Sequence, residues 1–192
     1  MSYLVFGLVL FLGVHSVRIF ADGWRTRTIA RIGHLPWKGI YALISIAGFV
    51  LLVWGYGQSR LESMVLYNPP VFTRHIAALL MLVSLVLVTA AYVPRNHIRR
   101  ALGHPMIVGV KVWAFAHLLS NGRLVDVMLF GAFLAWAVAD YIAARKRDRA
   151  AGTVYPAGDV LLTVVTVIVG IGVWAVLVSG LHLWLIGVPP LV

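Results

Sequence analysis

The sequence predicts an all-α protein that crosses a membrane several times, a polytopic transmembrane bundle of about six helices. Hydrophobic residues make up 61% of the 192 positions and charged residues only 11%, against roughly 25% charged residues in an ordinary soluble domain. A soluble chain of this length could not hide so much apolar surface in a single core. Residues 1–192 are therefore expected to form one integral-membrane domain whose main partner is the lipid bilayer.

Six predominantly apolar stretches define the expected helices, because a helix needs about 20 such residues to cross a bilayer. They cover residues 2–21, 38–57, 74–94, 104–120, 123–144 and 158–186. The fourth stretch has the weakest pattern, since Lys111 interrupts it and Pro105 stands at its start. Proline suits the first turn of a helix, where the backbone N–H that it lacks would have no partner.

Basic residues are concentrated in alternate connections between these stretches, and this alternation sets the orientation in the membrane. The three basic connections carry Arg25, Arg27, Arg31 and Lys38, then Arg95, Arg99 and Arg100, then Arg145, Lys146, Arg147 and Arg149. The other connections are nearly uncharged. We therefore expect the basic connections in the cytoplasm and both termini in the periplasm, in a bacterial inner membrane.

The net charge of +10 does not indicate nucleic-acid binding, because the charges lie in short membrane-flanking connections and not along one face of a soluble module. The chain contains no cysteine. This excludes disulfides, thiolate-ligated haem and iron–sulfur clusters. Histidine, carboxylates and methionine remain as the available metal ligands.

Two histidines lie inside separate apolar stretches, His15 in the first and His117 in the fourth. An ionisable residue inside a membrane helix is by default a candidate functional residue. Two neutral imidazoles from different helices are also the ligand set of a six-coordinate haem iron. Arg18 follows His15 on the same helix face, where its guanidinium could contact a propionate or a lipid phosphate.

The fourth stretch holds further candidate residues. Trp113 lies one turn before His117, on the same face of the expected helix. His104 precedes the helix near its cytoplasmic end. Lys111 lies near the middle of the stretch and needs a partner there; Asp140, in the inner half of the next helix, is the expected one.

These residues belong to segments that resemble a known family. His15-Ser16, the run RTRTIARIGHLPWKGIYALIS and the run GHPMIVGVKVWAFAHLLSNGRLVDVMLFGAFLAWAVAD resemble the NnrU family of bacterial membrane proteins, which is associated with nitrite and nitric oxide reduction in denitrification. The same regions are similar to 15-cis-zeta-carotene isomerase, which is regarded as a haem b protein with two histidine ligands. The resemblance implies haem b held by His15 and His117, with Arg18 near a propionate and Trp113 lining the pocket.

The expected depths of the two histidines do not match well. His15 lies about four residues inward of the middle of its helix and His117 about five residues outward, which separates them by roughly 13 Å in depth. His104, on the cytoplasmic side, is closer in depth to His15. It is therefore the rival second ligand.

Three functions stay open on the sequence alone. The protein could be an enzyme, such as a redox-gated cis–trans isomerase of a carotenoid-like polyene, which would bind a hydrophobic small molecule. It could be a haem-based electron carrier or nitric oxide responder. It could also be a non-catalytic assembly or transport partner of a reductase component.

Overall fold

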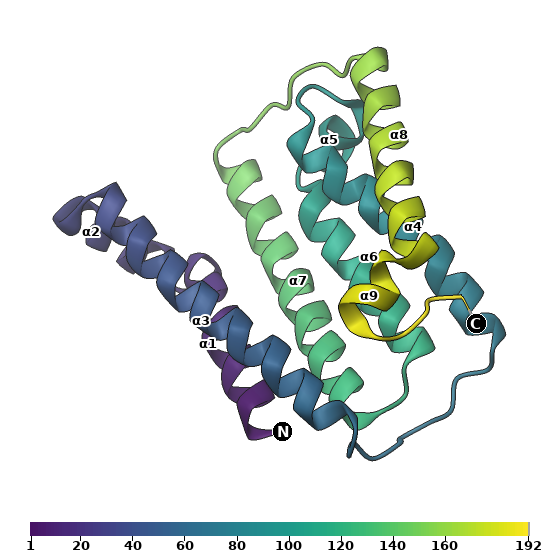
Figure 1. Ribbon diagram of the computed structural model, residues 1–192. Coiled ribbons are helices and arrows are strands. Elements are labelled where there is room, and N and C mark those ends of the chain that lie inside the picture. The colour runs from purple at the N-terminus through teal and green to yellow at the C-terminus, as the bar shows by residue number, and fades with distance from the viewer. Residues whose placement is uncertain (192) are drawn as a thin grey trace.

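The computed structural model describes residues 1–191 and is built from helices joined by short connections (Figure 1). The predicted all-α class is confirmed. Within residues 1–191, five helical runs are long and apolar enough to cross a membrane, and a sixth apolar helix is shorter. The elements are α1 (Ser2–Phe20), α2 (Asp22–Ile32), α3 (His34–Arg60), α4 (Phe72–Tyr92), α5 (His97–Leu102), α6 (Pro105–Ser120), α7 (Leu124–Ala150), α8 (Val160–Val176), η1 (Leu177–Leu181) and α9 (His182–Ile186).

α1 and α3 form a hairpin whose backbones touch because glycines remove the side chains between them. A Cβ atom on Gly7 would lie 2.5 Å from the backbone nitrogen of Leu52, and one on Gly48 would lie 2.7 Å from that of Phe11. Gly55 meets the backbone of α1 in the same way at Leu4. Helices in membranes associate through such close backbone packing.

The other long helices form a second group in which α4 packs against α6 and α8, and α6 packs against α7. Polar contacts fix this arrangement inside the apolar surroundings. The Ser84 hydroxyl on α4 donates to the Gly109 carbonyl of α6 at 2.8 Å, and the Trp174 indole on α8 donates to the Ala78 carbonyl of α4 at 2.9 Å. Large apolar side chains such as Phe49 and Ile168 point outward and are more than half exposed, which fits a lipid environment.

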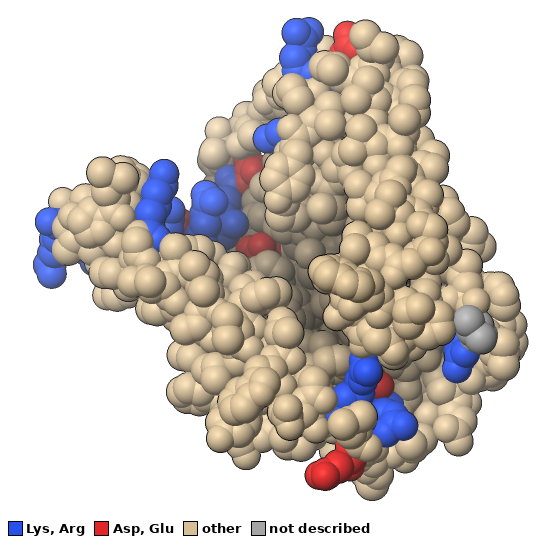
Figure 2. All heavy atoms as spheres, in the orientation of Figure 1, with Lys and Arg blue, Asp and Glu red and all other residues tan. Residues whose placement is uncertain are grey.

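The hairpin leans away from the second group, and the two meet through α7 (Figure 1). Their shared core includes Leu4 and Leu8 of α1, Leu52 of α3 and Phe130 of α7. This core lies near the end of the molecule where the chain begins. Toward the other end the hairpin and α7 diverge, and Figure 2 shows a hollow between them.

The two ends of the molecule differ in charge. We call the end that carries α2, α5 and residues 151–159 the basic end, because the basic connections predicted from the sequence lie there (Figure 1). α6 runs from this end, where His104 contacts Asp148 at 2.9 Å, to the opposite end, where the Asn121 carbonyl accepts from Tyr67 at 2.8 Å. The 16-residue helix therefore extends from one end of the molecule to the other beside the longer helices, so that successive connections lie at alternate ends.

Several stretches expected to be connections are helical. α2 lies within the first basic connection, α5 lies within the second, and α7 continues through the third to Ala150. The last apolar run is broken at η1, where Gly180 has a φ of 157°, so α9 turns away from α8. Pro105 occupies the first turn of α6 as expected.

Candidate functional site

His15 lies on α1 with three aromatic side chains around it. Its ring is 4.3 Å from the ring of Phe11, 5.2 Å from that of Tyr41 on α3 and 6.1 Å from that of Trp136 on α7, measured between centroids. Its Nδ1 atom is 2.6 Å from the carbonyl oxygen of Phe11. A carbonyl can only accept, so Nδ1 carries a proton, and in the neutral imidazole Nε2 keeps its lone pair.

His117 on α6 repeats this local geometry. Its Nδ1 atom donates to the Trp113 carbonyl, one turn earlier, at 2.9 Å. The imidazole stacks on Phe130 of α7, with centroids 4.5 Å apart, and lies 5.4 Å from the Trp113 ring. Its Nε2 is therefore also the unprotonated ring nitrogen, when the imidazole is neutral.

The two histidines do not face each other directly. Phe133 of α7 lies between the aromatic neighbours of the two histidines. Its ring centroid is 5.9 Å from that of Phe11, which contacts His15, and 5.3 Å from that of Trp113, which contacts His117. α7 is placed between α1 and α6 and presents aromatic residues toward both. The structure thus joins His15 and His117 through one continuous aromatic cluster, in which Phe11, Phe133 and Trp113 are the intervening rings.

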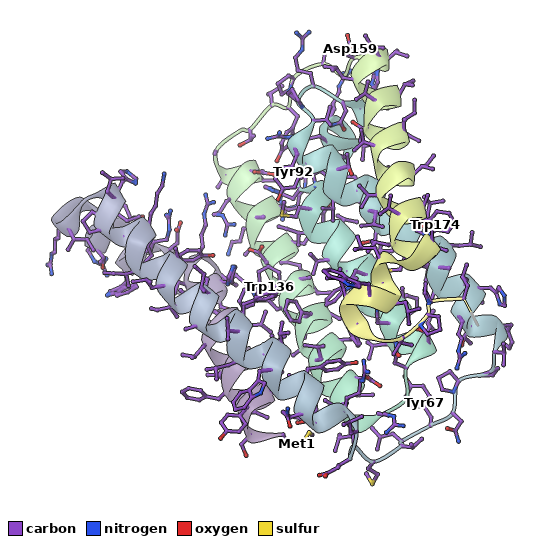
Figure 3. All side chains as sticks on the ribbon, viewed as in Figure 1. Met1, Tyr67, Tyr92, Trp136, Asp159 and Trp174 are labelled. Atoms are coloured by element: carbon purple, nitrogen blue, oxygen red, sulfur yellow. The ribbon has the colours of Figure 1, made fainter. Side chains whose placement is uncertain are left out.

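Figure 2 shows basic and acidic side chains at the edge of the hollow beside α7. Trp136, labelled in Figure 3 between the hairpin and α7, has an indole nitrogen that is buried without a hydrogen-bond partner. Asp140 follows one turn later and lies 3.9 Å from the Arg147 guanidinium. Arg147 also donates to the Arg18 carbonyl of α1 at 3.2 Å, which bridges the hairpin to α7.

The expected pair between Lys111 and Asp140 is wrong. The Lys111 ammonium lies 3.8 Å from the centroid of the Tyr141 ring, while Asp140 pairs with Arg147. Adjacent residues on a helix point about 100° apart. Tyr141 consequently faces Lys111 on α6, and its hydroxyl donates to the Leu102 carbonyl at the end of α5 at 3.3 Å. Asp140 faces away from Lys111.

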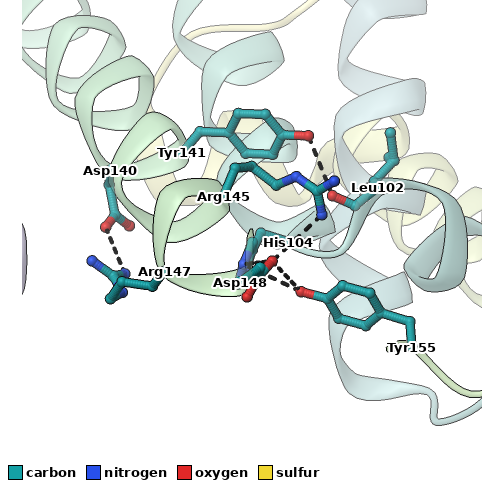
Figure 4. Close-up of polar contacts among 8 residues, drawn as sticks. All are labelled: Leu102, His104, Asp140, Tyr141, Arg145, Arg147, Asp148 and Tyr155. Carbon is teal, nitrogen blue, oxygen red and sulfur yellow. Dashed lines mark hydrogen bonds and ion pairs between the residues drawn. The ribbon is translucent and has the colours of Figure 1, made fainter. Parts of the chain in front are cut away.

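His104 belongs to a different cluster, at the basic end (Figure 4). Its Nε2 atom is 2.9 Å from a carboxylate oxygen of Asp148, and the Tyr155 hydroxyl donates to the same oxygen at 2.7 Å. Arg145 lies 3.4 Å from that oxygen. Burial and the bond to Asp148 raise the pKa of Tyr155, so its hydroxyl keeps its proton. The engaged Nε2 of His104 contrasts with the free Nε2 atoms of His15 and His117.

Sequence reasoning found the histidines but missed most of their neighbours. Phe133 and Asp148 were not singled out, and Tyr41 and Tyr155 were interpreted only as interfacial aromatics at the ends of helices. Their roles come from contacts between helices far apart in the chain, which apolar patterning does not encode. Within residues 1–191, no group of three or more histidine and carboxylate side chains gathers as a metal site.

These features define a multi-pass membrane protein with a partly buried aromatic cluster that contains two histidines, each with its Nδ1 atom bonded to a backbone carbonyl. The NnrU protein family model matches residues 3–190, and the chain belongs to the NnrU family. Comparison with curated proteins and with solved structures gives no match.

Proposed function

We propose that this NnrU-family protein binds haem b through His15 and His117 and supports nitrite and nitric oxide reduction in a bacterial inner membrane. The observation that supports haem binding is the pair of Nδ1 bonds to the carbonyls of Phe11 and Trp113. A ligating imidazole commonly donates its other N–H to such an acceptor, which fixes the tautomer and the ring orientation. The denitrification role rests on the resemblance to the family.

The surroundings of the two histidines are aromatic and largely apolar, which suits contact with a planar apolar group. The Phe11, Phe133 and Trp113 rings offer flat surfaces that exclude water, but they fill the space between the imidazoles. Simultaneous ligation by both histidines therefore requires Phe133 and Trp113 to move aside. Arg18 forms no ion pair among residues 1–191, and its guanidinium is available to a propionate.

Bound haem would supply a one-electron couple at its iron. The protein's own residues would determine how that couple is used. His15 and His117 would hold the haem iron, and the aromatic rings around them would keep water from it. His104 is less suited as a ligand, because Asp148 and Tyr155 already engage its Nε2.

The test is an absorption spectrum of the purified protein, oxidised and dithionite-reduced, with His15→Ala and His117→Ala beside it. We expect a Soret band and sharp reduced α and β bands, lost in His15→Ala. His117→Ala should lose the low-spin bands. His104→Ala and the exposed His75→Ala serve as controls and should keep the wild-type spectrum. A colourless protein that takes up no added haem would contradict the proposal and favour an assembly or transport partner of a reductase.

The same preparation separates the remaining functions. A reversible reduction potential without any product would support an electron carrier or a nitric oxide responder. Conversion of a bound polyene only when the haem is reduced would support a redox-gated isomerase. Copurification with a reductase subunit and no iron would support a scaffold.

We also propose that the basic end faces the cytoplasm and that both termini are periplasmic. The chain has no cysteine, so a single introduced one reports its own accessibility. Ser2→Cys is expected to react with a membrane-impermeant maleimide in cells with a permeabilised outer membrane. Thr26→Cys on α2 should react only after the inner membrane is broken. The opposite pattern would reverse the orientation.

A further inference from the structure

A pocket at the basic end lies beside the His104 cluster and has no part in the proposed haem site. Its volume is about 190 Å³. Its wall is formed by α5, by the last turns of α7 and by residues 152–155; the polar side chains in it are Arg100, Arg145, Asp148, Arg149, Thr153 and Tyr155. Three of these six side chains are guanidinium groups and only one is a carboxylate.

The single carboxylate is already neutralised within its own cluster. One oxygen of Asp148 contacts Tyr155 at 2.7 Å, His104 at 2.9 Å and Arg145 at 3.4 Å. Arg100 and Arg149, in contrast, form no ion pair in the described residues. The pocket therefore presents two uncompensated positive groups from two different helices.

The pocket wall is held in place by the chain around it. The segment after α7 is tied at one side by the Thr153 amide, which donates to the Asp148 carbonyl at 2.9 Å, and at the other by the Asp159 amide, which donates to the Arg95 carbonyl at 2.7 Å. Gly103 has a φ of 73°, and a Cβ atom there would lie 2.8 Å from both Arg145 and Tyr155. Such tight packing fixes the spacing between α5 and α7.

The size and the depth of the pocket limit what it can bind. Pockets for drug-sized ligands usually measure about 300–1,000 Å³, so this one suits a single small group. It lies just beyond the apolar part of α7, at the level where a bilayer presents its polar headgroups. Guanidinium groups bind phosphate oxygens through paired charge-assisted hydrogen bonds.

The geometry points to a binding site for a phosphate group in this pocket, with Arg100 and Arg149 as its ligands and Asp148 with Tyr155 as positioning residues. The phosphate would belong to the headgroup of an anionic membrane lipid or to a free phosphate ion. A lipid headgroup reaches the pocket from the adjacent bilayer without leaving the membrane.

The test uses the delipidated full chain in detergent, titrated with phosphatidylglycerol and read by native mass spectrometry. We expect the double variant Arg100→Gln/Arg149→Gln to bind the first lipid at least about tenfold more weakly, because two charge-assisted contacts are lost. The control Arg27→Gln/Arg31→Gln removes the same charge from α2, also at the basic end, and should retain wild-type affinity. Tyr155→Phe leaves the net charge unchanged and should weaken binding several-fold.

Two further titrations identify the source of the phosphate. If 10 mM inorganic phosphate displaces the lipid from the wild type but not from the double variant, the site takes free phosphate as well. If it does not, the headgroup with its lipid is the ligand. Equal losses in the pocket and control variants, or equally tight binding of oleate, which is anionic without phosphate, would show general charge attraction and overturn the proposal.

Discussion

Gly55→Leu is expected to prevent stable folding of the α1–α3 hairpin, whereas Gly57→Leu on the same helix should leave it intact. A Cβ atom at position 55 would overlap the backbone of Leu4 and would lie 2.8 Å from its Cα atom. These are main-chain atoms, which cannot swing aside as the end of a side chain can. Overpacking costs about 1–3 kcal/mol where side chains can adjust, and we expect a larger loss here.

Gly57 provides the matched control because nothing lies within 4 Å of its Cβ position. Leucine there would face the surroundings of the helix, and replacing glycine in a helix gains about 0.5–1 kcal/mol. The measurement is the thermal midpoint of each purified variant in detergent, followed by size-exclusion chromatography. A similar fall in both variants would show that the close contact of α1 with α3 is not what holds the hairpin. Because His15 is on α1, Gly55→Leu should also lose any bound haem.

The bounds of the membrane helices follow from the sequence because hydrocarbon thickness sets the length of an apolar run. The run expected at 74–94 is the helix Phe72–Tyr92, and the one expected at 104–120 is Pro105–Ser120. The hydropathy of a segment measures how favourable its transfer into lipid is, and does not measure its tendency to form a helix. The polar run Ala144–Arg149 consists of good helix formers apart from Asp148. It therefore continues α7, although its charge is typical of a connection between membrane helices.

The interruption of the last apolar helix at η1 could have been predicted from two neighbouring residues in the sequence. Ser179 and Gly180 stand together within an otherwise apolar run, and such pairs are a common cause of sharp helix kinks. The run reads as one long helix by hydropathy alone. In the structure it is divided at this pair into α8 and α9.

The candidate site was predictable in part, for reasons that differ between residues. His15 and His117 stand out because imidazoles are unusual in apolar runs, and Trp113 follows from helical spacing. The contact of Phe133 with both histidine environments depends on how α7 rotates between α1 and α6. Lys111 and Asp140 were predicted to pair because they lie at similar depths in the membrane. The orientation of α7 about its own axis instead places Tyr141 against Lys111.

A hydrogen bond between Tyr56 and Asp126, at the end of the molecule away from the basic end, should be as important for stability as the close contact of Gly55 with α1. Asp126 is 4% exposed and accepts two hydrogen bonds. One comes from the Tyr56 hydroxyl of α3 at 2.7 Å, and the other from the Arg123 backbone amide at the start of α7 at 3.2 Å. The carboxylate therefore joins the hairpin to α7 and also caps the helix.

Asp126→Ala is expected to destabilise the protein by about 2–4 kcal/mol, because it leaves the partly buried Tyr56 hydroxyl unpaired and removes the cap. Tyr56→Phe should cost about 1 kcal/mol, the net value of a typical hydrogen bond. Since both variants remove the same bond, the double variant should be scarcely less stable than Asp126→Ala alone. Denaturation of the four proteins in one detergent measures this cycle. Strictly additive losses would mean that Tyr56 and Asp126 act independently, and that their hydrogen bond does not help to hold the hairpin on α7.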